Sequence, residues 1–518
     1  MQRPLSEITS GLDILESAGP SDRAVSGLAY DSRDIQPGWL FFAFPGMHAD
    51  GHAYIDAAIG RGAVAVIHSE PLDHRDPGVT YLRVPDARLA MSPVADAFWG
   101  SPSSKLAVVG VTGTEGKSTT VWLTYRLLDL AGEKAGFVST VAYRVADAVL
   151  PNPAHQTTPE ATTVHERLAA MVESGRTYAV IESSSHGLSP RTGRLASVLF
   201  DVGIMTNVRH EHLEFHGTWE RYRDDKANLF RALDAHGHGK AIAGQAAEVP
   251  SFGVACVDDE SSDYFRAATR RPVYTYSMLS PGAADLWAED IRSDDEGADF
   301  VVVEAAGPRH KARINIPGRF NVENVLAAVV AVSKLTGRSV SSLVPLLPSL
   351  EPVLGRMTRV DRGQPFQVLV DYAHTPSSFE AILPPLAQQV SGRVICVFGS
   401  GGERDVKKRP EQGRIAAEHC GVVILSDEDP RGEDPMALLE DIAAGCAGKT
   451  RGTNLFLIPN RAEAIRAAIG MAGPGDAVIL LGKGHEDTII YASGTIPWNE
   501  LAEAERALAE AGWTGDVK

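Results

Sequence analysis

The sequence feature that most constrains this chain is a glycine-rich turn within residues 108–120, VVGVTGTEGKSTT. A β-branched run leads into it, and a helix-like segment, VWLTYRLL, follows. A strand, a glycine-rich loop and a helix in this order form a phosphate site, because backbone N–H groups approach the phosphates and the helix N-terminus adds about half a positive charge. Five residues separate Gly110 from Gly116, where the common motif has about four. The flanking context still favours a nucleoside triphosphate site over a plain glycine turn.

Two side chains at the start of the expected helix fit the chemistry of such a site. Lys117 would reach the β- and γ-phosphates, and the hydroxyl of Ser118 would hold Mg²⁺. The sequence therefore predicts a site for a nucleoside triphosphate and Mg²⁺.

Composition restricts the remaining function classes. The chain has 518 residues and a net charge of −17, which argues against a nucleic-acid or anionic-membrane partner. The four cysteines form no CxxC pair, the N-terminus lacks the apolar core of a signal peptide, and no apolar run approaches the ~20 residues of a membrane span. We expect a cytoplasmic globular protein.

The order of apolar and polar segments predicts an α/β fold of three domains. Candidate linkers at residues 99–105 and 349–355 divide the chain into domains 1–104, 105–350 and 351–518. In the central domain, strand-like runs at 178–181 and 202–205 alternate with helical stretches such as 164–172, which indicates a mainly parallel sheet. The last domain repeats the pattern with strands expected at 366–370, 394–398, 422–425 and 477–481.

Polar clusters follow several of these strands. Glu182 ends a strand and begins the run ESSSH, where it is a candidate Mg²⁺ ligand. His212 and His216 lie four residues apart, a spacing that suggests zinc, but the HExxH order is absent and magnesium accounts for the site better. Lys226 on its own is only a lysine on a helix face.

Four further loops, each directly after a strand of the last domain, mix glycine with charge. Ligands of open α/β sheets bind beyond the carboxyl ends of strands, so chemistry is expected there. The loops are residues 371–376, 399–405, 426–431 and 482–487.

Together these motifs resemble the Mur ligases, and most closely the branch that adds the third residue of the peptidoglycan stem peptide. The resemblance rests on GVTGTEGKS, ESSSH, NVRHEHLEFHG, GRFNVEN, DYAHTP and GKGHED, and it extends from about Tyr30 to Glu500. It implies a UDP-binding N-terminal domain, a central ATPase domain and a C-terminal Rossmann-like domain that receives the amino acid. The implied enzyme is an ATP-dependent acid–amino-acid ligase that joins a diamino acid to UDP-N-acetylmuramoyl-L-alanyl-D-glutamate through an acyl phosphate.

The resemblance also assigns residues. Lys117, Glu182, His212 and Lys226 are implied as catalytic, and Lys226 is expected to be carbamylated. The implied metal ligands are Ser118, Glu182, His212 and Lys226. The implied ATP contacts are Gly113, Thr114, Glu115, Gly116, Lys117, Ser118, Thr119, Asn321, Arg356 and Asp371. The implied contacts to UDP-sugar-dipeptide and diamino acid are Ser32, Thr157, Thr158, Ser184, Ser185, Arg194, Arg404, Asp429, Arg431, Gly482 and Glu486. A monomer is expected.

Some positions depart from the family pattern. Glu115 replaces the usual asparagine and adds negative charge beside the triphosphate, which should weaken ATP binding, whereas Ser118 keeps the hydroxyl of the usual threonine. Glu211 and Glu214 replace aspartates and keep their charge. Two extra residues precede Arg194, so Arg191 is its rival for the substrate contact.

The segment Asp429-Pro430-Arg431 bears on which diamino acid is added. Members that add meso-diaminopimelate typically carry Asn-Pro-Arg here, and Arg431 could bind a distal carboxylate. Asp429 beside Glu428 would instead favour a distal ammonium, as in lysine or ornithine. We expect lysine or ornithine slightly ahead of diaminopimelate.

Alternative functions remain open at this point. One is another Mur-like ligase of the pseudomurein or folylpolyglutamate type, although the YDSR segment at residues 30–33 argues against the latter. The other is a non-catalytic nucleotide-binding scaffold, which would have no use for the complete set of metal ligands.

Overall fold

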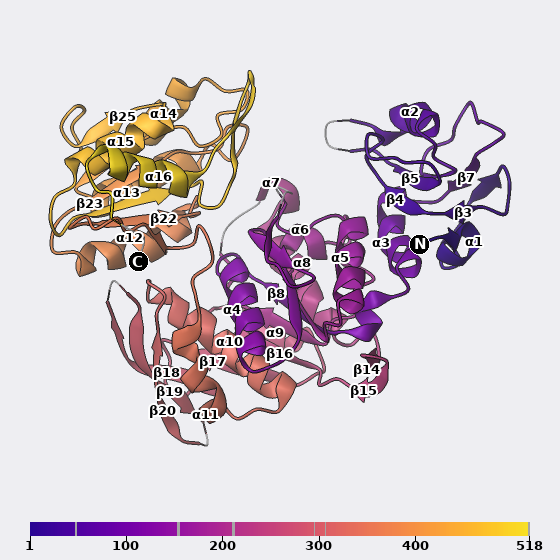
Figure 1. Cartoon of the computed structure of the whole chain (residues 1–518), viewed down its shortest axis with the longest axis horizontal. Helices are drawn as coiled ribbons and strands as arrows, with labels where there is room; N and C mark the ends of the chain where they lie inside the picture. Colours follow the sequence, from indigo (N-terminus) through magenta and orange to yellow (C-terminus); the bar gives the residue numbers. More distant parts are fainter. Residues whose placement is uncertain (47–48, 153–155, 210–212, 295, 306, 516–518) are drawn as a thin grey trace. The chain divides into compact units, whose positions relative to one another are not determined.

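The computed structural model describes residues 1–46, 49–152, 156–209, 213–294, 296–305 and 307–515, which form two compact units (Figure 1). The first unit comprises Met1–Tyr276 and Ala327–Ser339, and the second comprises Ser277–Leu326 and Val340–Lys518. His212 lies outside the described residues, as do Glu211 and the side chain of Glu214.

The N-terminal part of the first unit is a five-stranded sheet. Its strands, in spatial order, are β2 (Glu16–Ala18), β7 (Thr80–Arg83), β6 (Ala65–His68), β5 (Trp39–Ala43) and β4 (Gly27–Ala29). Core residues of α1 (Leu5–Ile8) and α3 (Ala87–Phe98) cover one face, and those of α2 (Ile55–Gly60) cover the other. Because both faces are covered, β5 is apolar at every position. The strands β1 (Arg3–Pro4) and β3 (Ala24–Val25) form a separate, two-stranded antiparallel sheet.

The rest of the first unit is built on a larger, mainly parallel sheet. Its strands, in spatial order, are β11 (Leu150–Pro151), β10 (Ala142–Arg144), β9 (Ala135–Val138), β12 (Tyr178–Glu182), β8 (Ala107–Thr112), β13 (Val202–Met205), β16 (Phe252–Cys256) and β17 (Val273–Ser277). The strands from β9 to β17 run parallel, whereas β10 and β11 are antiparallel additions at the edge. A hairpin of β14 (Gly239–Ile242) and β15 (Gln245–Glu248) stands apart.

Helices on both faces explain why β8, β9, β13 and β16 are buried at every position. The helix α4 (Lys117–Leu130) packs on β8, β9 and β12, while α5 (Ala161–Glu173) and α8 (Trp219–Ala232) share a hydrophobic core on the other face (Figure 1). Shorter helices are α6 (Ser185–Leu188), α7 (Leu213–His216) and α9 (Ser262–Ala267).

The second unit contains a parallel sheet with one antiparallel edge strand. Its strands, in spatial order, are β21 (Thr358–Arg359), β22 (Gln367–Asp371), β26 (Ala477–Leu481), β23 (Val394–Phe398), β24 (Val422–Leu425) and β25 (Leu455–Leu457). One face packs on α12 (Pro376–Gln389), α13 (Lys408–His419) and α14 (Pro435–Ala443), and the other on α15 (Arg461–Met471) and α16 (Glu500–Glu510). A hairpin of β27 (Thr488–Tyr491) and β28 (Gly494–Pro497) follows the last strand.

The second unit also includes an antiparallel ladder of three strands. The ladder consists of β18 (Leu286–Ser293), β19 (Ala298–Glu304) and β20 (Arg309–Ile314). The helices α10 (Phe320–Thr336) and α11 (Val340–Leu343) follow it in the sequence.

The α/β fold class predicted from the sequence is confirmed. Every strand predicted in the two large sheets is present within one residue of its expected bounds. All four cysteines are buried free thiols. Because the strands are parallel, the polar loops that follow them meet at one edge of each sheet.

Candidate functional sites

The glycine-rich loop connects the buried strand β8 to the N-terminus of α4. Gly113 has φ = 153°, and a Cβ there would lie 1.9 Å from Oγ1 of Thr206, so only glycine fits. The loop after β13 fixes its shape: the backbone N–H groups of Thr114 and Glu115 donate to the backbone and side-chain oxygens of Asn207 at 2.8 and 2.9 Å. These bonds fix the loop directly before the N-terminus of α4. The free backbone N–H groups of a helix N-terminus are suited to bind an anion.

Two side-chain oxygens that could bind a cation lie together behind this loop. Ser118, on the first turn of α4, donates its hydroxyl to Oε1 of Glu182 at 3.0 Å. Glu182 ends β12, is 2% exposed, and accepts a bond from the backbone N–H of Thr140 at 2.7 Å through its other oxygen. Hard oxygen donors of this kind fit Mg²⁺.

Lys226 reaches the same loop from α8. Its side chain is 1% exposed, and its Nζ donates to the carbonyl of Gly113 at 2.5 Å. The Nζ also lies 4.4 Å from the centre of the Tyr222 ring, whose hydroxyl is 3.1 Å from Oγ1 of Thr114. The lysine that looked ordinary in the sequence therefore lies at the phosphate loop.

Thr158 and Ser184 form a second group at the end of β12. The two hydroxyl oxygens are 2.9 Å apart, and the hydroxyl of Thr158 lies 3.0 Å from the backbone carbonyl of Glu182. Arg194 joins this group by donating to the carbonyl of Thr158 at 2.9 Å and to Glu160 at 2.7 Å. Its rival Arg191 instead donates to the carbonyl of Phe215 at 2.8 Å.

A chain of three buried side chains was missed by sequence reasoning. Nε2 of His216 is 3.0 Å from Oγ of Ser185, and its Nδ1 is 2.8 Å from the carboxylate of Asp225. This chain connects α6, α7 and α8 next to Lys226. The position of Asp225 directly before that lysine was the one available signal in the sequence. The four-residue spacing of His212 and His216 does not reveal that Asp225 contacts His216.

Three further predicted residues of the first unit are Ser32 and Thr157, which lie in loops, and Thr119, which lies on α4. Ser32 is buried in the loop after β4, between Asp31 and Arg33, which pair with each other. Thr157 is half-buried next to Thr158, and Thr119 is buried on the first turn of α4.

The second unit gathers its polar loops at the carboxyl edge of its sheet. Asp371 ends β22, and burial raises the pKa of its carboxyl group, although the backbone N–H groups of Ala373 and Met357 donate to it at 2.8 and 2.7 Å. The guanidinium of Arg356 lies 4.6 Å above the ring of Tyr372. Asn321, near the start of α10, donates to the carbonyl of Pro317 at 2.6 Å.

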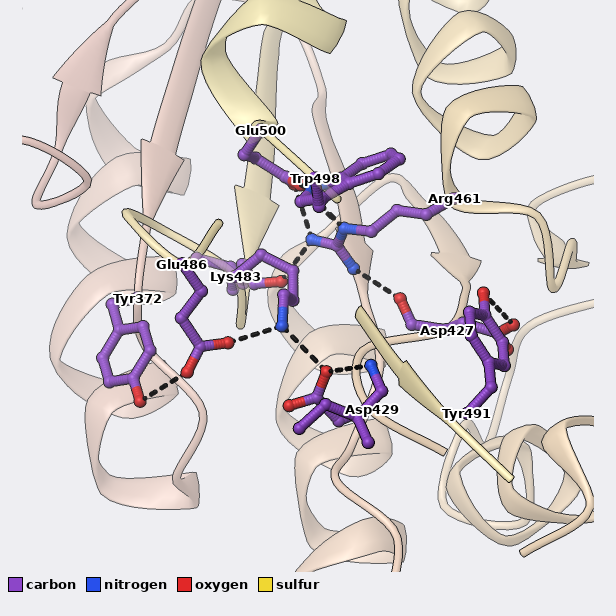
Figure 2. A network of polar contacts seen from close by, with 11 residues as sticks. Tyr372, Asp427, Asp429, Arg461, Lys483, Glu486, Tyr491, Trp498 and Glu500 are labelled. Carbon is purple, nitrogen blue, oxygen red and sulfur yellow. Dashed lines mark hydrogen bonds and ion pairs between the residues drawn. The ribbon is translucent and has the colours of Figure 1, made fainter. Parts of the chain in front are cut away.

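Lys483 connects two of the predicted pocket residues. Figure 2 shows its Nζ between the carboxylates of Asp429, at 2.9 Å, and Glu486. Burial alone would lower the pKa of this 1%-exposed side chain, but the charges of Glu486 and Asp429 raise it. The hydroxyl of Tyr372 donates to the other oxygen of Glu486 at 3.1 Å. In this structure the ammonium that neutralises Asp429 is therefore supplied by Lys483, which reduces the charge that the sequence argument assigned to Asp429.

Glu428 and Arg431 each keep a buried polar atom that has no hydrogen-bond partner in the described part of the chain. These atoms are Oε2 of Glu428 and Nε of Arg431. Burial raises the pKa of Glu428. Gly482, at φ = 100°, leaves space for that carboxylate, since a Cβ would lie 2.6 Å from its Oε2. Arg404 is exposed on the neighbouring loop. This edge of the sheet therefore presents acceptors and donors suited to a zwitterion.

Comparisons with known proteins agree with this arrangement. Residues 24–99 match the catalytic domain of the Mur ligase family, residues 111–332 match the Mur ligase middle domain, and residues 355–484 match the Mur ligase glutamate ligase domain. The chain is 46% identical to the UDP-N-acetylmuramyl-tripeptide synthetase of Treponema denticola over 99% of both chains, and 47% identical to that of Treponema pallidum over 100% of this chain and 99% of the other.

A solved structure titled UDP-N-acetylmuramoyl-L-alanyl-D-glutamate–2,6-diaminopimelate ligase is 27% identical, with a TM-score of 0.64 over 99% of this chain and 100% of that one. In the described residues, no helix is both long and apolar enough to cross a bilayer. The matches to this one family run along most of the chain, and the relatives are nearly half identical to it over its whole length. The chain therefore belongs to the Mur ligase family of ATP-dependent ligases.

Proposed function

We propose that this enzyme joins a diamino acid to the D-glutamate of UDP-N-acetylmuramoyl-L-alanyl-D-glutamate in the cytoplasm, as a monomer with no nucleic-acid or membrane partner. The observation that carries the proposal is the meeting of Lys117, Ser118, Glu182 and Lys226 at one glycine-rich loop. The high identity to tripeptide synthetases over the whole chain supports the substrate.

The first half-reaction would take place at the phosphate loop. The γ-phosphoryl group of ATP passes to an oxygen of the substrate carboxylate, which gives an acyl phosphate and ADP. Lys117 would lie along the phosphates, and the backbone N–H groups at the N-terminus of α4 would donate to the phosphate oxygens. Mg²⁺ bound by Ser118 and Glu182, with His212, would neutralise the transferring group.

Lys226 would support a second Mg²⁺ after carbamylation. The ammonium group first loses a proton, carbon dioxide then adds to the neutral amine, and a second proton leaves, so that the cation becomes an anionic carbamate. The burial of the Nζ beside the loop favours this, because an ammonium held there would repel the metal.

The UDP-sugar-dipeptide would be bound by the hydroxyl groups after β12. Ser184, Ser185, Thr157 and Thr158 supply the donors, and Arg194 would bind the peptide carboxylate. Its contact with Thr158 favours it over Arg191. Ser32 would contact the uridine side.

The second half-reaction needs the diamino acid. Its α-amine attacks the acyl carbon, phosphate leaves, and the attacking nitrogen loses a proton. Asp429, Arg431, Gly482 and Glu486 would hold the amino acid together with Arg404. The unpartnered carboxylate oxygen of Glu428 supports a distal ammonium and so favours lysine or ornithine, whereas the unpartnered Nε of Arg431 supports diaminopimelate as second candidate.

Phosphate release tests the reaction. Release from ATP should require both the UDP-dipeptide and a diamino acid, and equal release without either would exclude a ligase and favour a scaffold or plain ATPase. Comparing kcat/KM for lysine, ornithine and meso-diaminopimelate then identifies the amino acid. Ligation to a substrate without the UDP-sugar would instead indicate a pseudomurein-type or folylpolyglutamate-type ligase.

A further inference from the structure

We propose that Arg461 is a positioning residue for the diamino acid: it holds the loops after β24 and β26 at the spacing that forms the pocket. The inference rests on the proposed function, since that function makes these loops the amino-acid site. Arg461 lies on the first turn of α15 and is outside the set of residues expected to touch a substrate.

All three nitrogens of the Arg461 guanidinium donate hydrogen bonds. Its Nε and Nη2 form a double contact with the carboxylate of Glu500, at 2.9 and 2.6 Å. Its Nη1 donates to the backbone carbonyl of Asp427 at 3.1 Å, and its Nη2 donates to that of Leu481 at 2.7 Å. Both side chains of the pair are fully buried.

The two carbonyl groups lie directly before the pocket residues. Asp427 precedes Glu428 and Asp429, and Leu481 precedes Gly482. In the sheet β23 separates β24 from β26, so no ladder hydrogen bond joins their ends. Arg461 bridges the ends of the two strands. Lys483, in the loop after β26, makes a second contact between the same two loops by donating to the carboxylate of Asp429.

Only an arginine can make this set of contacts. Its planar guanidinium donates in several fixed directions, whereas a lysine has one compact ammonium group. A buried ion pair is weak evidence for stability, because desolvation of two charges offsets their attraction. The pair of Arg461 and Glu500 therefore acts mainly by fixing the positions of the two backbone segments whose carbonyl groups it binds.

Glu500 holds the guanidinium in turn. The carboxylate also accepts a bond from Nε1 of Trp498 at 2.6 Å. Shortening the acid by one methylene would draw the guanidinium away from the two carbonyls, so Glu500→Asp provides a second variant that keeps every charge.

The test compares Arg461→Lys with Arg393→Lys in the full-length enzyme. Arg393 is the matched control, because it donates to the carbonyl of Met471 and to Asp476 at the opposite edge of the same sheet. We expect Arg461→Lys to raise KM for the preferred diamino acid by about tenfold or more, because small displacements of binding groups have large effects. KM for ATP and for the UDP-dipeptide should stay within about twofold. Arg393→Lys should change none of the three constants.

Melting curves show whether each variant is folded, and Glu500→Asp provides a second test of the same contact. If Arg461→Lys does not fold, Glu500→Asp should show the same selective rise in KM. A folded Arg461→Lys with an unchanged amino-acid KM would overturn the inference, and so would an equal loss toward all three substrates. Failure of the wild-type enzyme to ligate any diamino acid would instead reject the proposed function.

Discussion

The hydroxyl of Ser118 and the carboxylate of Glu182 lie 3.0 Å apart although 64 residues separate them in the chain. The parallel pairing of β8 with β12 produces this proximity, because both strands end at the same edge of the sheet. The pair places two side-chain oxygens, which we propose as Mg²⁺ ligands, next to each other at the N-terminus of α4.

Removal of the hydroxyl should weaken the metal site. We expect Ser118→Ala to lower activity and raise the Mg²⁺ concentration needed for half-maximal rate, by about 10- to 100-fold. Ser118→Thr keeps the hydroxyl and should remain near wild type. A titration of rate against Mg²⁺ measures both variants. An unchanged Mg²⁺ requirement in Ser118→Ala would show that Ser118 is not a ligand.

Lys226 should be essential and should depend on carbon dioxide. Lys226→Ala removes the only atom that can be carbamylated at this position, so we expect turnover to fall by at least about 100-fold. In the wild-type enzyme, activity should fall in buffer depleted of carbon dioxide and return when bicarbonate is added. Near-normal turnover of Lys226→Ala would refute the carbamate, and an unchanged rate without carbon dioxide would do the same.

Glu115 offers a way to improve ATP binding. Its backbone groups already fix the loop, through Oδ1 of Asn207 and Oγ1 of Thr206. Glu115→Gln should therefore keep the loop shape and remove one negative charge beside the phosphates. We expect KM for ATP to fall by about two- to tenfold, with the effect shrinking at high salt. A rise in KM would mean that the carboxylate assists the metal or the nucleotide.

Most of the fold could be predicted from the sequence, because the buried strands are short, largely apolar runs, and several of them, such as β8, β23 and β26, are followed by glycine. The parallel order also predicted correctly that the polar loops collect at the ends of strands. The contacts of individual side chains were not predictable. Nothing in the spacing shows that His216 binds Ser185 and Asp225, or that Arg461 binds Glu500, since these contacts depend on how helices pack across the sheet.

Asp429 illustrates the same limit. In the sequence, its charge beside Glu428 suggested an acidic pocket for an ammonium. In the structure, Lys483 and the backbone N–H of Ile490 both donate to Oδ1 of Asp429. The preference for lysine, ornithine or diaminopimelate thus depends more on Glu428 and Arg431 than on the residue that differs from the family pattern. It stays a prediction for the kinetic comparison.

Asp427 should make stability depend on pH in the direction opposite to that of a typical ion-paired acid. Burial raises the pKa of its carboxyl group from 3.8 to about 6, even though the hydroxyl of Tyr491 donates to it and Arg461 lies nearby. The folded state therefore holds this proton more tightly than the unfolded state does. The stabilising contribution is complete below the unfolded pKa and is lost as the pH rises through about 6.

Asp427→Asn isolates this effect, because the amide oxygen can still accept the bond from Tyr491 but carries no charge. We expect the Tm of the variant relative to wild type to increase between about pH 4 and about pH 7. Glu418→Gln, which removes an exposed carboxylate from the same unit, is the control for general charge effects. A Tm difference for Asp427→Asn that stays flat, or that falls with pH, would show that the Asp427 carboxylate is not destabilised by its burial at the end of β24.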